Sequence, residues 1–435
     1  MLSSQADKIQ SRIADDDESV AQRCVDVIFA CRNYEVLPAM PAKQSHKWTF
    51  RSRFKRDAFG WRSQPAITRI REAVSEIKKA GRKDKVLAAE GAVLFLERVS
   101  PAIQHVDSSS GAIGNAVNTA IDILVPIIAE APAEDKLRSD WLERLWDAVE
   151  ADNIPYLESL ADHWGTLCAT AVHAAHWADR VLPVLRMAWG PDRNLHGYFK
   201  GTTACLSALH KCARHEEILE LLETAPYKFW PYRCWGVKAL VALSRKAEAI
   251  KYAEERRELN DSPISIAQAC EEILLSDGMA DQAYSLYAID ANRKATHLAT
   301  FRAICGKYPH KTPKEILDDL VAASSSGDRG KWFAAAKSAG LYDEAVALAN
   351  SAPCDPKTLI RAARDNVAVE PGFALEAGMA ALRWMAAGYG YEIGMPDVRA
   401  AYDHTLAAAR RLGCETGTAD RIRELAMEQP LQHVR

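Results

Sequence analysis

The side chains best suited to chemistry lie in a short segment where cations alternate with aromatic rings. Residues 43–62 read KQSHKWTFRSRFKRDAFGWR. Lysine and arginine neutralise phosphates and aromatic rings stack on bases, so these are the residue types that nucleic-acid binding needs. The segment predicts nucleic-acid-binding residues at Lys47, Trp48, Arg51, Arg53, Lys55, Arg56, Trp61 and Arg62.

The same segment also has a structural interpretation. Its aromatic rings can anchor it on the first helices, while its cations meet acidic residues elsewhere in the molecule or in a dimer. Residues 43–85 hold 14 Lys and Arg against 4 Asp and Glu in a chain of net charge −3, which leaves −13 for the remainder. Such asymmetry is typical of an interaction surface or of an internal electrostatic contact. The internal contact is the favoured interpretation, nucleic acid is the second, and an acidic protein partner is the third.

Two groups of residues have the side chains of metal ligands but lack the spacing. Cys205, His210, Cys212 and His215 point in different directions if they lie on one helix, so we expect core cysteines and histidines beside an exposed turn. His173 and His176 share a helical face, but no Glu follows His173 as a zinc protease requires. We therefore predict no metal site.

Catalytic motifs are equally weak. Residues 327–331 read Gly-Asp-Arg-Gly-Lys, but a phosphate-binding loop needs four residues between its glycines and Ser or Thr after its Lys, and here Trp332 follows. No nucleophile elbow or dinucleotide-binding glycine pattern occurs either. The sequence predicts a protein without enzymatic activity or cofactor, although a site assembled from distant residues would escape a motif search.

The elements that carry these residues are predicted to be helices throughout. Apolar residues recur at spacings of three and four, whereas the alternation typical of strands is nearly absent. In residues 139–149, one apolar stripe is formed by Trp141, Leu142, Leu145, Trp146 and Val149. The fold class is therefore all-α.

A repeat is visible in the second half of the chain. Aligning Ile218, Ala249, Ala283, Ile316 and Ala345, each of which follows a turn, gives steps of 31, 34, 33 and 29 residues. This period is typical of helix-turn-helix repeats, in which small residues occur where the two helices cross closely. The sequence predicts an α-solenoid of antiparallel helix hairpins, preceded by an N-terminal helical module.

Two resemblances follow from these motifs. Gly340-Leu-Tyr-Asp-Glu-Ala345 resembles tetratricopeptide repeats, which implies a protein-binding solenoid. Residues 86–183, with Val106-Asp-Ser-Ser-Ser-Gly-Ala-Ile-Gly114 and Trp141-Leu-Glu-Arg-Leu-Trp146, resemble the helical region that follows SWIM-type zinc-binding domains in bacterial proteins. The Cys-x-Cys and Cys-x-His pairs of the zinc module do not occur, so the resemblance implies no zinc.

The expected organisation has three parts: an N-terminal helix in 1–40, a basic segment with a helical module in 41–199, and repeats in 200–435. We expect a protein-interaction scaffold, with aromatic anchors at Tyr198, Trp230, Tyr232 and Trp235. The alternative is a nucleic-acid-binding protein that uses residues 43–85, in bacterial defence or a mobile element.

The predicted location is the cytoplasm. The N-terminus lacks a basic stretch followed by an apolar one, so no secretion signal is expected. No apolar run approaches the length of about 18 residues that crosses a bilayer. The best run, Ile121–Ile128, contains Asp122 and Pro126. We therefore expect no membrane partner.

Overall fold

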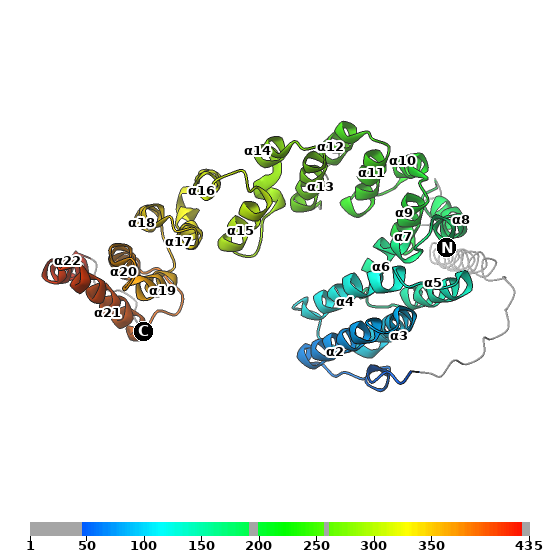
Figure 1. Cartoon of the computed structure of the whole chain (residues 1–435), viewed down its shortest axis with the longest axis horizontal. Helices are drawn as coiled ribbons and strands as arrows, with labels where there is room; N and C mark the ends of the chain where they lie inside the picture. The colour runs from blue at the N-terminus through cyan, green and yellow to red at the C-terminus, as the bar shows by residue number, and fades with distance from the viewer. Residues whose placement is uncertain (1–45, 191–198, 256–260, 429–435) are drawn as a thin grey trace, which may run out of the picture. The chain divides into compact units, whose positions relative to one another are not determined.

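The computed structural model describes residues 46–190, 199–255 and 261–428 (Figure 1). Every regular element in these residues is a helix, which confirms the all-α class. The helix predicted in 1–40 lies outside the described residues. The chain divides into two compact units, Met1–Asp261 and Ser262–Arg435. The division predicted at residue 200 stays a prediction.

The first unit consists of one short 3₁₀ helix and eleven α-helices among its described residues. These are η1 (Phe50–Ser52), α2 (Ser63–Gly81), α3 (Lys85–Ile103), α4 (Ala112–Ala129), α5 (Asp135–Glu150), α6 (Glu158–Asp162), α7 (Trp164–Leu167), α8 (Ala171–Ala188), α9 (Thr202–Lys211), α10 (His215–Thr224), α11 (Trp230–Ala242) and α12 (Lys246–Glu255). Helices α2, α3 and α4 each pack on the other two (Figure 1). These three helices frame the candidate site.

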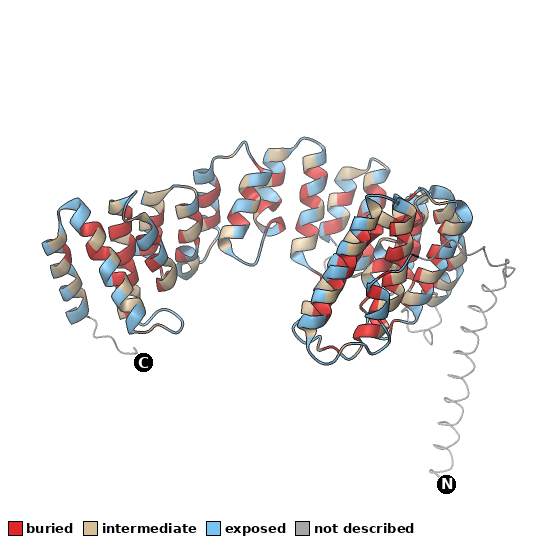
Figure 2. Cartoon of the chain, turned by 60° about the horizontal axis from the view of Figure 1, so that its bottom comes forward, coloured by how far each residue is buried: buried red, intermediate tan, exposed pale blue. Residues whose placement is uncertain are grey.

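The helices of this group form where the apolar periodicity predicts them. Helix α2 buries Ile67, Ile70, Val74 and Ile77, which recur at intervals of three and four residues, as an amphipathic helix requires. Helix α3 begins at the Asp84 side chain, which accepts a hydrogen bond from the Leu87 backbone N–H at 2.9 Å. Figure 2 shows the buried residues as bands along the helices.

Helix α4 requires a correction to the expectation about membrane spans. It is 18 residues long and apolar enough to cross a bilayer by length and composition alone, despite Asp122 and Pro126. Seven of its residues, from Ile113 to Ile128, are buried against the rest of the unit. Burial in the core accounts for this apolar character.

At the C-terminal ends of several helices, a cationic side chain from another part of the chain donates hydrogen bonds to the backbone carbonyl oxygens. Arg138 of α5 donates to the carbonyl oxygens of Ile128 and Ala131, at 2.7 and 2.6 Å, where α4 ends. Lys200 donates in the same way to carbonyl oxygens at the end of α5, Lys228 at the end of α10, and Arg233 at the end of α12. In the second unit, Arg383 donates to the Ala349 carbonyl near the end of α18 (Tyr342–Ser351). A cation at this position satisfies free carbonyls and complements the helix dipole.

The second unit consists of ten α-helices and one 3₁₀ helix among its described residues. These are α13 (Pro263–Ser276), α14 (Ala280–Ala291), α15 (His297–Lys307), α16 (Pro313–Ala322), η3 (Ser326–Trp332), α17 (Phe333–Ser338), α18 (Tyr342–Ser351), α19 (Pro356–Asn366), α20 (Pro371–Ala386), α21 (Met395–Leu412) and α22 (Glu415–Glu428). Most contacts join helices that are neighbours or next neighbours in sequence, such as α19 with α20 and α19 with α21.

The residues aligned by the sequence repeat occupy equivalent positions. Ile218, Ala249, Ala283, Ile316 and Ala345 are each the fourth residue of their helix, in α10, α12, α14, α16 and α18. All five are 0% exposed. The period found in the sequence therefore corresponds to every second helix of the structure.

Candidate nucleic-acid interface

Residues 46–62, here called the anchor loop, lie on α2 and α3 and are held by their aromatic rings. Trp48, Phe50 and Phe54 are 5%, 2% and 1% exposed. Phe50 and Phe54 contact the ring of Phe95 on α3 edge to face, with ring centroids 5.8 and 5.1 Å apart. The rings therefore fasten the loop to the core, and the loop's cations are left at the surface.

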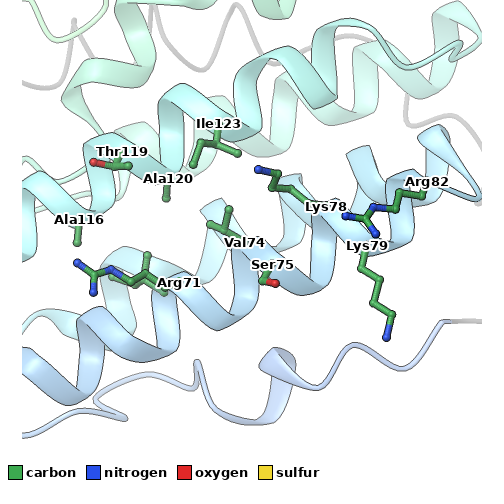
Figure 3. Close-up of a pocket in the computed structure, with 11 residues that line it drawn as sticks. Arg71, Val74, Ser75, Lys78, Lys79, Arg82, Ala116, Thr119, Ala120 and Ile123 are labelled. Carbon is green, nitrogen blue, oxygen red and sulfur yellow. The ribbon is translucent and has the colours of Figure 1, made fainter.

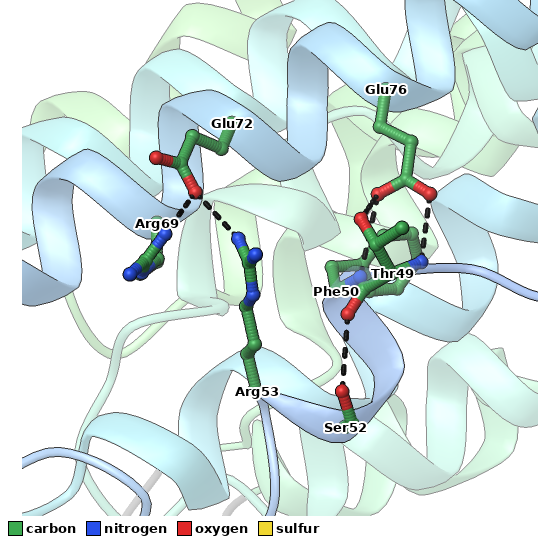
Figure 4. A network of polar contacts seen from close by, with 7 residues as sticks. All are labelled: Thr49, Phe50, Ser52, Arg53, Arg69, Glu72 and Glu76. Carbon is green, nitrogen blue, oxygen red and sulfur yellow. Dashed lines mark hydrogen bonds and ion pairs between the residues drawn. The ribbon is translucent and has the colours of Figure 1, made fainter.

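Two carboxylates on α2 complete the attachment of the anchor loop (Figure 4). Glu76 accepts hydrogen bonds from the backbone N–H and the hydroxyl of Thr49, the former at 2.7 Å. Glu72 accepts from Arg69 at 2.6 Å and from Arg53 at 2.7 Å. The hydrogen bond from Arg69 is the main reason that the pKa of Glu72 is lowered. The two acidic residues of α2 are thus occupied by the anchor loop and by Arg69.

The predicted nucleic-acid-binding residues divide into two groups in the structure. Lys47, Arg51, Arg53, Lys55, Arg56, Trp61 and Arg62 are exposed, with Trp61 at 72%. Trp48 is buried, so its predicted role in stacking on bases is wrong and it serves as an anchor. Of the seven exposed residues, Arg53 alone has an ion pair with another described residue. Pairing with described residues therefore accounts for one of the loop's cations, and the favoured interpretation, pairing within the chain or in a dimer, stays a prediction.

A groove of about 480 Å³ lies between α2 and α4 and is here called the α2/α4 groove. Figure 3 shows most of its lining, with cations on α2 and uncharged side chains on α4. The residues that line it are Ile70, Arg71, Val74, Ser75, Lys78, Lys79, Arg82, Ala116, Thr119, Ala120 and Ile123. No acidic side chain is among them.

Three of the four cations of the groove, Arg71, Lys78 and Arg82, lie in one row together with Ser75, whereas the Lys79 side chain is directed away from α4 (Figure 3). Arg71, Ser75, Lys78 and Arg82 fall within about 60° of arc around α2, because each helical residue advances about 100°. Within the part of the chain that the structure describes, none of these cations has an ion pair. The groove therefore presents positive charge that no described acidic side chain pairs with. Sequence reasoning placed these residues in the basic segment but did not single them out, although their helical spacing is readable from the sequence.

No family model, curated protein or solved structure matches the chain. The resemblances to tetratricopeptide repeats and to the SWIM-associated helical region therefore stay predictions.

The aromatic anchors predicted for a protein partner lie mostly in the core. Tyr232 and Trp235 are each 5% exposed, and Trp230 is half-buried. The ring of Tyr232 lies 4.4 Å from that of Phe229, while Trp235 packs against His210 and lies under the Lys238 amine. Tyr198 lies outside the described residues. Tyr232 and Trp235 are therefore corrected from surface anchors to packing residues.

The remaining sequence candidates do not assemble into a metal or phosphate site. The rings of His210 and His215 lie 5.0 Å apart, but no group of three metal-ligand types forms among the described residues. Cys205 is fully buried, and burial raises its thiol pKa to about 12. In the glycine-containing stretch, the Lys331 amine pairs with Asp328 at 2.6 Å. These residues are explained by local packing and ion pairing.

Proposed function

We propose that this protein binds nucleic acid through the cationic surface of residues 46–85. One observation carries the proposal. Of the cations on this surface, Arg53 and Arg69 are the two with an ion pair to a described residue, and both pair with Glu72. Cations held at a surface without acidic partners attract phosphates, and the buried rings of the anchor loop keep them in place.

This proposal places nucleic-acid binding ahead of internal pairing, which is the favoured interpretation of the basic segment from the sequence alone. Internal neutralisation of the cations would require acidic side chains within reach. The acidic residues of α2 hold the anchor loop, and Asp84 caps α3 through its hydrogen bond from Leu87. Among the residues that the structure describes, the positive surface is accordingly better explained by a polyanionic partner than by pairing with acidic side chains. We propose no catalytic activity and no cofactor for this surface, and a cytoplasmic location.

Fluorescence anisotropy with labelled DNA and RNA tests the proposal. We expect binding at low salt, about 50 mM, and a logarithm of affinity that falls linearly with the logarithm of salt concentration. A variant with Arg51, Lys55 and Arg56 changed to Glu should bind more weakly. Lys136→Glu is the control, because Lys136 is an exposed cation of α5 outside this surface. The absence of binding to both nucleic acids at low salt would rule out the proposed function.

A second candidate function, a protein-interaction scaffold, rests on the repeat. The equivalent buried positions in α10, α12, α14, α16 and α18 support a solenoid of hairpins of the tetratricopeptide type. Stacked hairpins of this kind offer long binding surfaces for peptides. Affinity purification of the tagged full-length protein tests this function, and failure to recover a partner at stoichiometric amounts would count against it.

A further inference from the structure

The α2/α4 groove differs from the rest of the cationic surface because its two walls have different chemistry. One wall is the row of Arg71 and Lys78 on α2 and Arg82 at its C-cap, and Figure 3 shows the Lys78 amine directed towards α4. The other wall consists of Ala116, Thr119 and Ile123 of α4, none of which is charged. A ligand that fits must therefore carry its charge along one side and uncharged surface along the other.

The length of the cationic wall indicates an extended ligand. From Arg71 to Arg82 there are eleven steps of about 1.5 Å along the helix axis, or roughly 16 Å. Arg71, Lys78 and Arg82 lie in single file because they share one face of the helix. They match one row of phosphates.

A double helix does not fit this arrangement. A duplex presents two phosphate rows across each groove, whereas the lining has cations on one wall and none on α4, so the groove matches one row of phosphates rather than two. A helix that reads duplex DNA enters the major groove, which is about 12 Å wide and admits one helix. The anchor loop lies along one side of α2, attached through Glu72 and Glu76, and α4 packs on another side. With neighbours on both sides, α2 is not presented as a lone helix of the kind that enters the major groove.

We propose that the α2/α4 groove binds a single strand of nucleic acid, with phosphates along Arg71, Lys78 and Arg82 and with sugars and bases against Ala116 and Ile123. This inference rests on the proposed function and names the form of nucleic acid that is bound. The Arg71 side chain is the most diagnostic contact. Lys78 lies in the last turn of α2, where a cation also complements the helix dipole, whereas Arg71 lies in the middle of the helix.

Matched charge reversals test the groove. We compare Arg71→Glu/Lys78→Glu with Arg51→Glu/Lys55→Glu, which changes the net charge equally on the anchor loop, in anisotropy titrations with labelled oligo(dT) and with a duplex. We expect the groove variant to lose at least about tenfold more affinity for the single strand than the loop variant. The slope of the logarithm of affinity against the logarithm of salt concentration should also become less steep by about 1.4, since each lost phosphate contact removes about 0.7 from its magnitude on single strands.

A variant that binds the single strand more strongly than the wild type provides a second test, because an unfolded variant could not show this gain in affinity. Thr119 is exposed on the uncharged wall, so Thr119→Arg should strengthen single-strand binding and Thr119→Glu should weaken it. Equal losses for the groove and loop variants, or wild-type affinity for the duplex as high as for oligo(dT), would overturn the inference and leave the proposed function standing. If the wild type binds neither nucleic acid at low salt, the proposed function itself fails.

Discussion

The indole ring of Trp48 lies against the backbone of Gly91 on α3. A Cβ atom on Gly91 would be 2.3 Å from Cζ2 of that ring, closer than any real contact. Glycine at this position therefore lets the ring approach the helix backbone and bury itself at 5% exposure. This contact lies next to the cationic part of the anchor loop, so packing at Gly91 and the presentation of positive charge are linked.

Gly91→Ala should lower the free energy of unfolding by about 1–3 kcal/mol, because Trp48 or α3 must shift to admit the methyl group. Urea unfolding monitored by tryptophan fluorescence measures this change. Gly114→Ala on α4 is the control, since a Cβ there meets nothing within 4 Å and alanine favours a helix. If the two variants are equally stable, the close packing of Trp48 on Gly91 is not a constraint on the fold.

The burial of Trp48 could not be predicted from the sequence alone. An aromatic ring between cations suits both a base-stacking surface and an anchor, and the two interpretations differ only in what faces the ring. The residue that faces the Trp48 ring, Gly91, lies on α3, and this contact is known only once α3 is seen to pack beside the anchor loop. The burial of Ile70 and Val74 in α2 needs no such knowledge, because amphipathic spacing is local and can be read from the sequence.

One part of the candidate site, the row of cations, was likewise predictable because helical spacing is local. The positions of Arg71, Lys78 and Arg82 on one face of a helix follow from their spacing. The uncharged opposite wall did not follow, because it depends on α4 packing against α2. Nor did it follow that the two acidic residues of α2, Glu72 and Glu76, contact the anchor loop and Arg69 and not the described cations of the groove.

Arg138 gives the second prediction. It is 4% exposed and donates to the carbonyl oxygens of Ile128 and Ala131, and burial lowers the pKa of its guanidinium. Arg138→Met removes both donors. The Ala131 carbonyl keeps its hydrogen bond from the backbone N–H of Ala133 at 2.8 Å, whereas the buried Ile128 carbonyl loses its side-chain donor, so we expect a loss of about 1–3 kcal/mol in the free energy of unfolding. Lys136→Met on the same helix is the control, because Lys136 is exposed.

Chemical denaturation of the two variants distinguishes a capping role from a general effect of charge. Both substitutions remove one positive charge from α5, so a purely electrostatic effect would make them similar. A loss confined to Arg138→Met supports the cap. Losses of the same size in both variants would mean that the hydrogen bonds to the end of α4 do not stabilise the unit.

His210 makes the stability of the first unit depend on pH. Its pKa is lowered from the usual 6.5 to about 4, first by burial and then by the neighbouring His215 and Lys238. The unfolded chain therefore binds a proton at His210 that the folded protein does not bind, throughout the interval between these two values. Its contribution to stability is fully present above about pH 6.5 and is lost as the pH falls towards 4.

His210→Gln should remove this part of the acid sensitivity. We expect the stability difference between wild type and variant to change between pH 6.5 and 4, in the direction of a relatively more stable variant at the lower pH. NMR titration of the His210 ring measures its pKa directly, and Lys238→Met should raise it, because Lys238 is one of the causes of the shift. A difference that is constant across this interval would contradict the lowered pKa.

The last prediction concerns a buried polar cluster in the second unit. Glu271 is 0% exposed and accepts hydrogen bonds from the Tyr308 hydroxyl and the Asn292 amide, each at 2.6 Å, and from the Lys307 amine. Burial and the contact with Glu271 raise the pKa of Tyr308. Tyr308→Phe keeps the ring but removes the donor, so a buried carboxylate oxygen loses one of its partners. We expect a loss of about 1–3 kcal/mol in the free energy of unfolding.

Tyr284→Phe is the matched substitution, because the Tyr284 hydroxyl donates to Asp319 at 2.6 Å at an exposed position. Water can replace that donor, so the loss should stay below about 1 kcal/mol. Urea unfolding of both variants compares one tyrosine–carboxylate hydrogen bond inside the core with one at the surface. Equal losses would show that water reaches Glu271, and the cluster would then contribute no more to the second unit than a surface contact does.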